Sequence, residues 1–316
     1  MFLILKVAGI FLLAFLCSFL YRSVGARSRD LLPGLRYDNT STSSSAVAFR
    51  QRSRTSLVET REIYSDSLGD FIQYSVLLPP GYASSLDQHF PIVYWLHGSN
   101  GSGMSLEPLA EKFTDAMSNG FMVESIIVFP ESEKLSMWVN SKDSTYPSED
   151  ILIKDLIPHI NRRFRVSQSR HSHTIAGFSM GGYGAARLAI KYNKIFSRVV
   201  MVGAGTLDES LEDTPRANEM TKRQVLDNVF GGSDLYFYQQ SPRFLLKAHK
   251  KDLLSNPLDI SIFVGTQDEV YPQNLDLSRF LLNQGVPNRL VSLPGINHSL
   301  KSYIFHSGNA LFLNTW

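Results

Sequence analysis

One stretch constrains this chain more than any other, Thr174 to Gly184. It begins as a short apolar strand, passes through Gly177-x-Ser179-x-Gly181, and continues into a helix-forming run. A serine at the tip of a strand-to-helix turn needs neighbours without bulk, because the backbone there is strained and tightly folded. The pattern predicts that the Ser179 hydroxyl is exposed at the carboxyl end of a strand. A glycine-rich turn without chemistry is the alternative interpretation.

The rest of the chain alternates between strand and helix patterns. Residues 59–65 and 71–78 predict a hairpin, and five apolar runs predict buried strands at 90–96, 125–129, 198–202, 260–264 and 290–293. Strands that alternate with helices favour an α/β fold, a doubly wound and mostly parallel sheet with helices on both faces. Residues 206–257 are mostly polar and helical in pattern. We expect them to form a helical cap insertion over the site.

Composition limits the classes of function. Apolar residues make up 43% of the 316 residues, which is enough for a large core. Before residue 58 the chain carries 8 Lys and Arg against 2 acidic residues, and the remaining 23 basic and 27 acidic residues give the globular part a net charge of −4. That charge argues against a nucleic-acid surface. Cys17 is the only cysteine, so the globular part has neither a disulfide nor a cysteine nucleophile.

The N-terminal region has the pattern of a targeting segment and not of a part of the folded domain. Residues 2–20 are apolar except for Lys6 and Ser18, which predicts that residues 1–26 are a signal peptide or a membrane anchor. Residues 27–57 are rich in Arg and Ser and predict a disordered linker. We therefore expect a secreted or periplasmic protein, with a membrane tether through residues 2–20 and an organelle address as alternatives. The catalytic domain is expected at residues 58–316.

Three expected strand ends carry the groups that serine chemistry needs. A serine hydroxyl is a poor nucleophile at neutral pH, so it needs a histidine to take its proton and an acid to orient the imidazole. Asp268 follows the strand at 260–264, and His298 follows the strand at 290–293. The order Ser179, Asp268, His298 is that of the α/β hydrolases. Glu269 is adjacent to Asp268 but is expected to point elsewhere.

Other residues near the expected site have supporting roles. The glycine-rich loop after residue 96 predicts that the Ser99 N–H donates to an oxyanion, together with the N–H of Met180 at the start of the serine helix. His97 and Trp138 are candidates for contact with the substrate, although packing is the alternative for each. The sequence shows no metal-ligand spacing and no phosphate-binding glycine loop, so we expect neither metal nor cofactor.

Several motifs together resemble the Putative esterase family of α/β hydrolases, which includes feruloyl esterases, S-formylglutathione hydrolases, enterochelin esterases and mycolyltransferases. The similarity runs from about Tyr74 to His298 and rests on Leu78-Pro79-Pro80-Gly81-Tyr82, Trp95-Leu96-His97-Gly98-Ser99-Asn100-Gly101-Ser102, Asp155-Leu156-Ile157-Pro158, Ile175-Ala176-Gly177-Phe178-Ser179-Met180-Gly181-Gly182 and Gly295-Ile296-Asn297-His298. The resemblance implies Ser179 as nucleophile, Asp268 and His298 as its partners, and the Ser99 and Met180 amides as the oxyanion hole.

These observations predict a serine carboxylesterase that acts on a small-molecule or polysaccharide-linked ester through an acyl-enzyme on Ser179. An acyltransferase that passes the acyl group to a sugar or lipid alcohol is the first alternative. A non-catalytic binding protein on a hydrolase scaffold is the second.

Overall fold

The computed structural model describes residues 57–101 and 106–312. The predicted leader, and the predicted linker up to residue 56, lie outside these residues and stay predictions. Within the described part of the chain, no helix is both long and apolar enough to cross a membrane.

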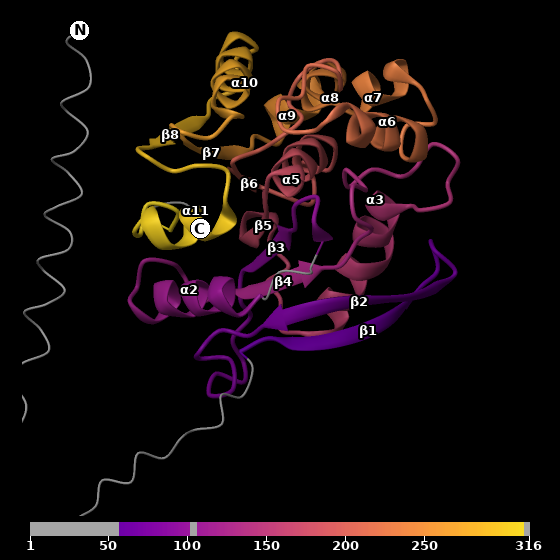
Figure 1. Cartoon of the computed structure of the whole chain (residues 1–316). Helices are drawn as coiled ribbons and strands as arrows, with labels where there is room; N and C mark the ends of the chain where they lie inside the picture. The colour runs from indigo at the N-terminus through magenta and orange to yellow at the C-terminus, as the bar shows by residue number, and fades with distance from the viewer. Residues whose placement is uncertain (1–56, 102–105, 313–316) are drawn as a thin grey trace, which may run out of the picture. The chain divides into compact units, whose positions relative to one another are not determined.

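In the described part of the chain, eight strands form one sheet, in the order β1-β2-β4-β3-β5-β6-β7-β8 (Figure 1). The strands β1 and β2 pair antiparallel, as do β2 and β4, and all other neighbours are parallel. The strands are β1 (Glu59–Ser65), β2 (Asp70–Leu77), β3 (Ile92–Leu96), β4 (Ile126–Pro130), β5 (His173–Phe178), β6 (Arg198–Val202), β7 (Asp259–Gly265) and β8 (Arg289–Leu293). The predicted α/β fold with a mostly parallel sheet is confirmed.

The third strand begins two residues later than the apolar pattern predicts. Phe90 is buried, but it lies outside β3 and makes an isolated bridge to Val166. Pro91 separates the two, and because proline has no N–H it cannot continue the hydrogen-bond ladder of a central strand. Hydrophobicity alone therefore overestimated the length of the strand.

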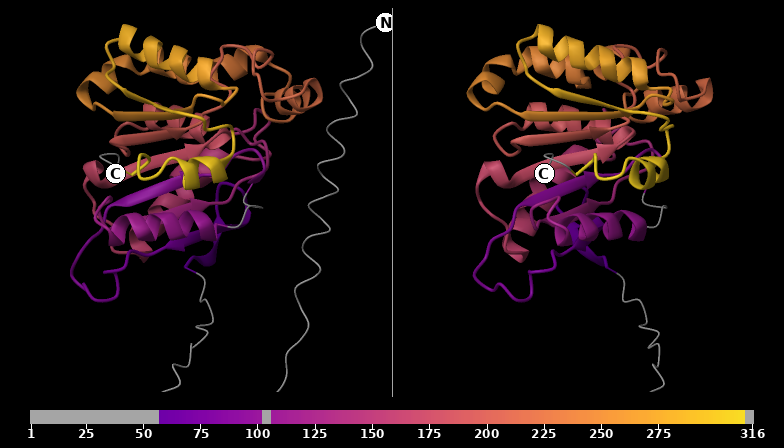
Figure 2. Two further views of the ribbon diagram at one scale, coloured as in Figure 1. Left: turned by 60° about the vertical axis from the view of Figure 1, so that its left-hand side comes forward. Right: turned by 90° about the vertical axis from the view of Figure 1, so that its left-hand side faces the viewer.

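Two helical layers bury the two faces of the sheet (Figure 2). One layer consists of α2 (Glu107–Ser118) and α11 (Leu300–His306), which pack against each other and against Trp95, Phe129 and Phe178. The other layer is built on the serine helix α5 (Met180–Lys191), which contacts β3, β5 and β6. It continues with α3 (Ser148–Asp150), the π-helical segment η2 (Ile151–Leu156), α4 (Ile157–Arg163) and α10 (Tyr271–Asn283).

The stretch between β6 and β7 is helical, as predicted, but its helices do not line the site. They are α6 (Glu219–Asn228), α7 (Asp234–Gln240), α8 (Pro242–Ala248) and α9 (Lys250–Ser255). Helix α8 packs on α5, and the Tyr236 hydroxyl of α7 donates to the carbonyl of Asn140. Of residues 206–257 only Arg216 lines the cavity around Ser179. The four helices therefore lie outside the cavity lining, and a cap formed by residues 206–257 stays a prediction.

Candidate active site

The Ser179 turn has the strained backbone that its sequence demands. Ser179 lies between β5 and α5 with φ 57° and ψ −119°, a conformation that costs a non-glycine residue about 1–3 kcal/mol. A Cβ on Gly177 would lie 2.4 Å from the Gly181 carbonyl, and one on Gly181 would lie 2.0 Å from the carbonyl oxygen of Leu96. Only glycine fits at either position. The turn therefore presents the Ser179 side chain at the carboxyl end of β5.

A continuous hydrogen-bonded chain links Ser179 to the two predicted partners. His298 Nε2 lies 2.9 Å from Ser179 Oγ, and His298 Nδ1 lies 2.8 Å from each carboxylate oxygen of Asp268. The Asp268 side chain has no exposed surface, and that of His298 is 5% exposed. With Nδ1–H donating to the carboxylate, Nε2 is left as the acceptor for the serine proton. The structure thus brings together three residues from loops that follow β5, β7 and β8.

Asp268 is held as a carboxylate by three donors. Burial alone would raise the pKa of its carboxyl group, but hydrogen bonds from His298, from the Val270 amide and from the Tyr303 hydroxyl outweigh burial and lower that pKa. The Val270 N–H lies 3.0 Å from Oδ1 and the Tyr303 hydroxyl 2.7 Å from Oδ2. Tyr303 belongs to α11, and nothing in the sequence marked it. Its hydroxyl also accepts the N–H of Gly265, which connects β7 to Asp268.

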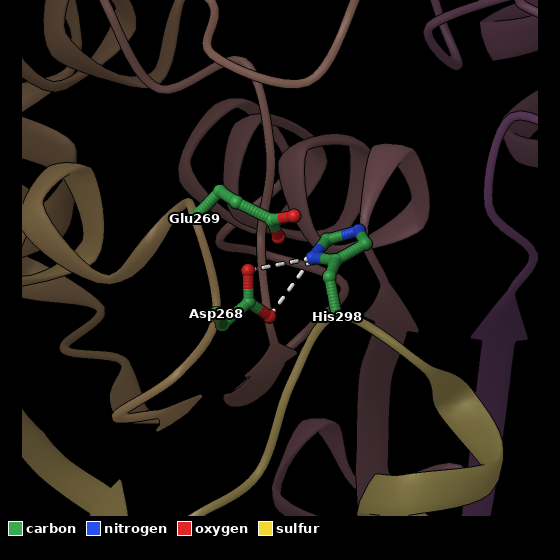
Figure 3. Close-up of side chains that lie close together, drawn as sticks. All are labelled: Asp268, Glu269 and His298. Carbon is green, nitrogen blue, oxygen red and sulfur yellow. Dashed lines mark hydrogen bonds and ion pairs between the residues drawn. The ribbon is translucent and has the colours of Figure 1, made fainter. Parts of the chain in front are cut away.

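Glu269 lies beside the acid and the base instead of pointing away from them, so this expectation is wrong. Figure 3 shows its side chain next to those of Asp268 and His298, and the ligand atoms of the three lie within 4.8 Å of one another. Its carboxylate accepts a hydrogen bond of 2.8 Å from Arg216, the cavity-lining residue that precedes α6. That ion pair turns the Glu269 side chain toward the site.

The same three side chains are a group that could hold a metal ion among the residues described. His298 Nδ1 is already bonded to Asp268, and Nε2 is bonded to Ser179. Because a metal needs the lone pair of a ring nitrogen, binding at Nδ1 would break the hydrogen bond to Asp268. The hydrogen-bonded chain occupies both ring nitrogens of His298.

The loop after β3 lies next to Ser179, and Ser99 lines the same cavity. Met180 is the first residue of α5, where the backbone N–H groups have no partner within the helix. His97 also lines the cavity, but both of its ring nitrogens face the backbone: Nδ1 lies 2.8 Å from the carbonyl of Gly98, and Nε2 accepts the N–H of Ser132 at 3.1 Å. Burial is the main cause that lowers the pKa of His97. A neutral His97 ring, with one nitrogen as donor and the other as acceptor, is consistent with these two hydrogen bonds to the backbone.

Trp138 does not line the cavity, so the prediction that it contacts the substrate is wrong. Its side chain is buried, with 1% exposed, and its ring packs against His97 with the centroids 4.9 Å apart. Its Nε1–H donates to the carbonyl of His97 at 3.1 Å, and a Cβ on Gly184 would lie 2.7 Å from its side chain. Trp138 therefore supports the loop after β3 from behind.

A buried ion cluster anchors α5 behind the site, and no sequence pattern predicted it. Arg187 of α5 is fully buried and donates to Glu149 at 2.6 Å, to the carbonyl of Trp138 at 2.8 Å and to the side chain of Gln240 at 2.7 Å. Burial opposes ionisation of Glu149, but Arg187 and Lys191 outweigh it and lower its pKa to about 2. The cluster ties α5 to α3, to the Trp138 loop and to α7.

The cavity at Ser179 and His298 has a volume of about 650 Å³. It lies within the size range of small-molecule sites. A largely apolar cavity next to a strained serine, which is hydrogen-bonded to a histidine and through it to a buried carboxylate, defines a serine hydrolase of the α/β-hydrolase fold.

Comparison with known proteins agrees with this class. The model of the Putative esterase family matches residues 65–307, and the chain belongs to that family, as a carboxylic ester hydrolase of the serine type. It is 25% identical over 207 residues to an acetyl esterase of Caldicellulosiruptor saccharolyticus, across 63% of this chain and 74% of the relative. It is 30% identical over 122 residues to an esterase of Mycobacterium tuberculosis, across 37% of this chain but only 26% of that longer protein.

Solved structures of this fold are also similar. A ferulic acid esterase superposes with a TM-score of 0.65 at 21% identity, covering 81% of this chain and 97% of that chain. The S-formylglutathione hydrolase of Staphylococcus aureus superposes with a TM-score of 0.63 at 19% identity, covering 80% and 96% of the two chains. At these identities the likeness concerns the fold.

Proposed function

We propose that the protein hydrolyses carboxylic esters through an acyl-enzyme on Ser179, with His298 as general base and Asp268 as the acid that orients it. The single observation that carries the proposal is the hydrogen-bonded chain from Asp268 through His298 to Ser179 Oγ at a cavity of small-molecule size. Names of similar proteins include acetyl esterase, ferulic acid esterase and S-formylglutathione hydrolase, so they leave the acyl group and the alcohol open. The substrate is proposed as a small-molecule or polysaccharide-linked ester.

In the first half of the reaction Ser179 Oγ attacks the ester carbonyl carbon while its proton passes to His298 Nε2. The negative charge on the carbonyl oxygen is stabilised by the N–H groups of Ser99 and Met180, and each such donor typically contributes about 3 kcal/mol. The imidazolium then gives its proton to the alcohol oxygen, the C–O bond breaks and the alcohol leaves. Asp268 stabilises the imidazolium without taking the proton.

In the second half a water molecule gives a proton to His298 Nε2 and attacks the acyl carbonyl carbon. Collapse of the second tetrahedral intermediate breaks the bond to Ser179 Oγ, which recovers its proton from His298, and the acid leaves. Transfer of the acyl group to another alcohol would follow the same steps with that alcohol in place of water. This is the acyltransferase alternative.

The test compares Ser179→Ala with the wild type on p-nitrophenyl acetate and butyrate. We expect kcat to fall by at least about 10³-fold, because the variant has no nucleophile. Ser255→Ala, an exposed serine at the end of α9, is the matched control and should keep the wild-type rate. Equal rates for Ser179→Ala and the wild type would exclude the mechanism. Absence of fluorophosphonate labelling at Ser179 would favour a non-catalytic protein, and ester formed in preference to acid with an added alcohol would favour acyl transfer.

A further inference from the structure

The cavity that contains Ser179 has a polar end and an apolar end. Its polar lining comes from residues 97–101 after β3, from His298 and from the charged side chains of Glu131, Arg216 and Lys301. Its apolar end lies between α2 and α11 and is lined by Leu106, Leu109, Ile304 and Phe305, with Trp95 and Phe129 from the ends of β3 and β4. These six side chains carry no charge and, apart from the Trp95 N–H, no hydrogen-bonding group. A ligand gains affinity there by burying apolar surface.

The size of the cavity exceeds what the smallest acyl groups can fill. A formyl or acetyl group attached to Ser179 would occupy a small part of the 650 Å³. Each additional CH₂ group that enters apolar surroundings is expected to improve binding about fourfold. An alkyl chain also needs no hydrogen-bond partner, whereas a phenolic hydroxyl buried without one is penalised.

A second hollow of about 690 Å³ adjoins the first, and Gly101 and Glu131 line both. It lies between β2 and the segment after β4, and its lining is more polar than that of the first. Three carboxylates line it, those of Asp70, Glu131 and Glu133, against one ammonium group, that of Lys134. This polar groove, as we call it, therefore carries an excess of negative charge. It suits hydroxyl groups or a cation and repels an anion.

We propose that the apolar end between α2 and α11 binds the acyl half of the ester, an alkyl chain longer than acetyl, and that the polar groove binds a neutral or cationic alcohol. This rests on the proposed function and adds the orientation of the substrate. The alcohol leaves while the acyl group is still attached to Ser179. The apolar lining suits the group that is retained, and the groove, which is more open to solvent than the cavity, suits the group that departs first.

Two ester series test the orientation. In p-nitrophenyl alkanoates only the acyl chain lengthens, and kcat/KM is expected to rise at least about 50-fold from acetate to octanoate. In alkyl acetates only the alcohol lengthens, and kcat/KM should change less than about threefold. A rise confined to the alkyl acetates, or a methyl ferulate rate well above that of methyl octanoate, would overturn the acyl assignment while serine catalysis stands. Loss of activity on both series in the wild type would instead contradict the proposed function.

Variants that fill the apolar end test whether its lining residues determine the preference for long acyl chains. Ile304→Trp and Leu106→Trp should lower the octanoate-to-acetate ratio of kcat/KM at least tenfold. Ile304 is buried and Leu106 is half-buried, so Leu106→Trp keeps the test informative if the first variant fails to fold. Leu254→Trp, an exposed leucine of α9, is the matched control and should keep the ratio. Labelling by a small fluorophosphonate probe verifies that each variant is folded. An unchanged ratio in labelled Leu106→Trp would contradict the assignment.

The charge of the alcohol is tested with octanoyl esters of glycerol and of glycerate, which differ in one carboxylate. The glycerol ester should be preferred by about threefold at low ionic strength, and the preference should disappear at high salt, because exposed charges are screened. Glu133→Gln should reduce the preference, and Glu111→Gln on α2, outside the residues that line the groove, should not. Preference for glycerate would overturn the groove assignment alone.

Discussion

The two sides of the catalytic site are held in place by different means. On the Ser179 side the position depends on two glycines without space for a Cβ, on the positive φ of the serine, and on the buried ion pair of Arg187 and Glu149 behind α5. On the His298 side the position depends on side-chain contacts, the Tyr303 hydroxyl under Asp268 and the exposed ion pair between Arg216 and Glu269. Substitutions that disturb packing on the Ser179 side should mainly lower the free energy of unfolding. Substitutions on the His298 side should mainly lower the catalytic rate.

The largest effect is expected from Gly181→Ala. Its Cβ would lie 2.0 Å from the carbonyl oxygen of Leu96, so β3 and α5 would have to separate. We expect the free energy of unfolding to fall by about 4 kcal/mol or more, measured by urea denaturation. Gly98→Ala, where the nearest atoms are 3.4 Å away, should change it by less than about 1 kcal/mol. Equal stabilities of the two variants would show that the close approach at Gly181 can relax.

Glu149→Gln comes next, since it leaves the Arg187 guanidinium buried without its carboxylate. The expected loss is about 3–5 kcal/mol at pH 7. Because the pKa of Glu149 is lowered to about 2, below its ordinary 4.5, its stabilising contribution is full above about pH 4.5 and is lost as the pH falls toward 2. The difference in stability between wild type and variant should shrink over that interval. Asp150→Asn, whose partner Lys154 is exposed, should cost less than about 1 kcal/mol and serves as the control.

Tyr303→Phe tests the His298 side. The change removes the donor to Asp268 Oδ2 and leaves the buried Gly265 N–H without its acceptor, which costs about 1–3 kcal/mol. We expect kcat to fall about tenfold with KM nearly unchanged, because the carboxylate that orients His298 is less firmly held. Tyr271→Phe, whose hydroxyl contacts Ser292 at the surface, should have the wild-type kcat. A fall in stability without any change in kcat would limit Tyr303 to packing.

The smallest effect is expected at the Arg216–Glu269 pair. Its side chains are 40% and 56% exposed, so their coupling should be below about 1 kcal/mol, or about fivefold in kcat/KM. A double-mutant cycle of Arg216→Gln and Glu269→Gln measures the coupling, and raising the salt concentration should abolish it. A larger coupling that resists salt would mean that the two sides of the site are less different than the contacts suggest.

The same contrast explains how much of the molecule could be predicted. The Ser179 turn is local in the sequence, so its strand, glycines and helix could be recognised directly, and β1 and β6 begin and end where the pattern predicts. Asp268 and His298 could be proposed because each follows a strand. The ion cluster could not, since Glu149 and Arg187 are 38 residues apart and charge alone does not indicate burial. The predictions for Trp138 and Glu269 were wrong for the same reason. The Trp138 side chain is oriented by His97 and the Glu269 side chain by Arg216, and both partners come close only when the chain folds.

The position of β8 at the end of the sheet order has a consequence for synthesis. Ser179, its strand and its helix leave the ribosome about a hundred residues before His298, and domains tend to fold as they emerge. A nascent chain that has completed β5 and β6 still lacks the strands that deliver the acid and the base. In the proposed mechanism, the nascent chain therefore cannot hydrolyse an ester until the segment that contains Asp268 and His298 has folded against β6.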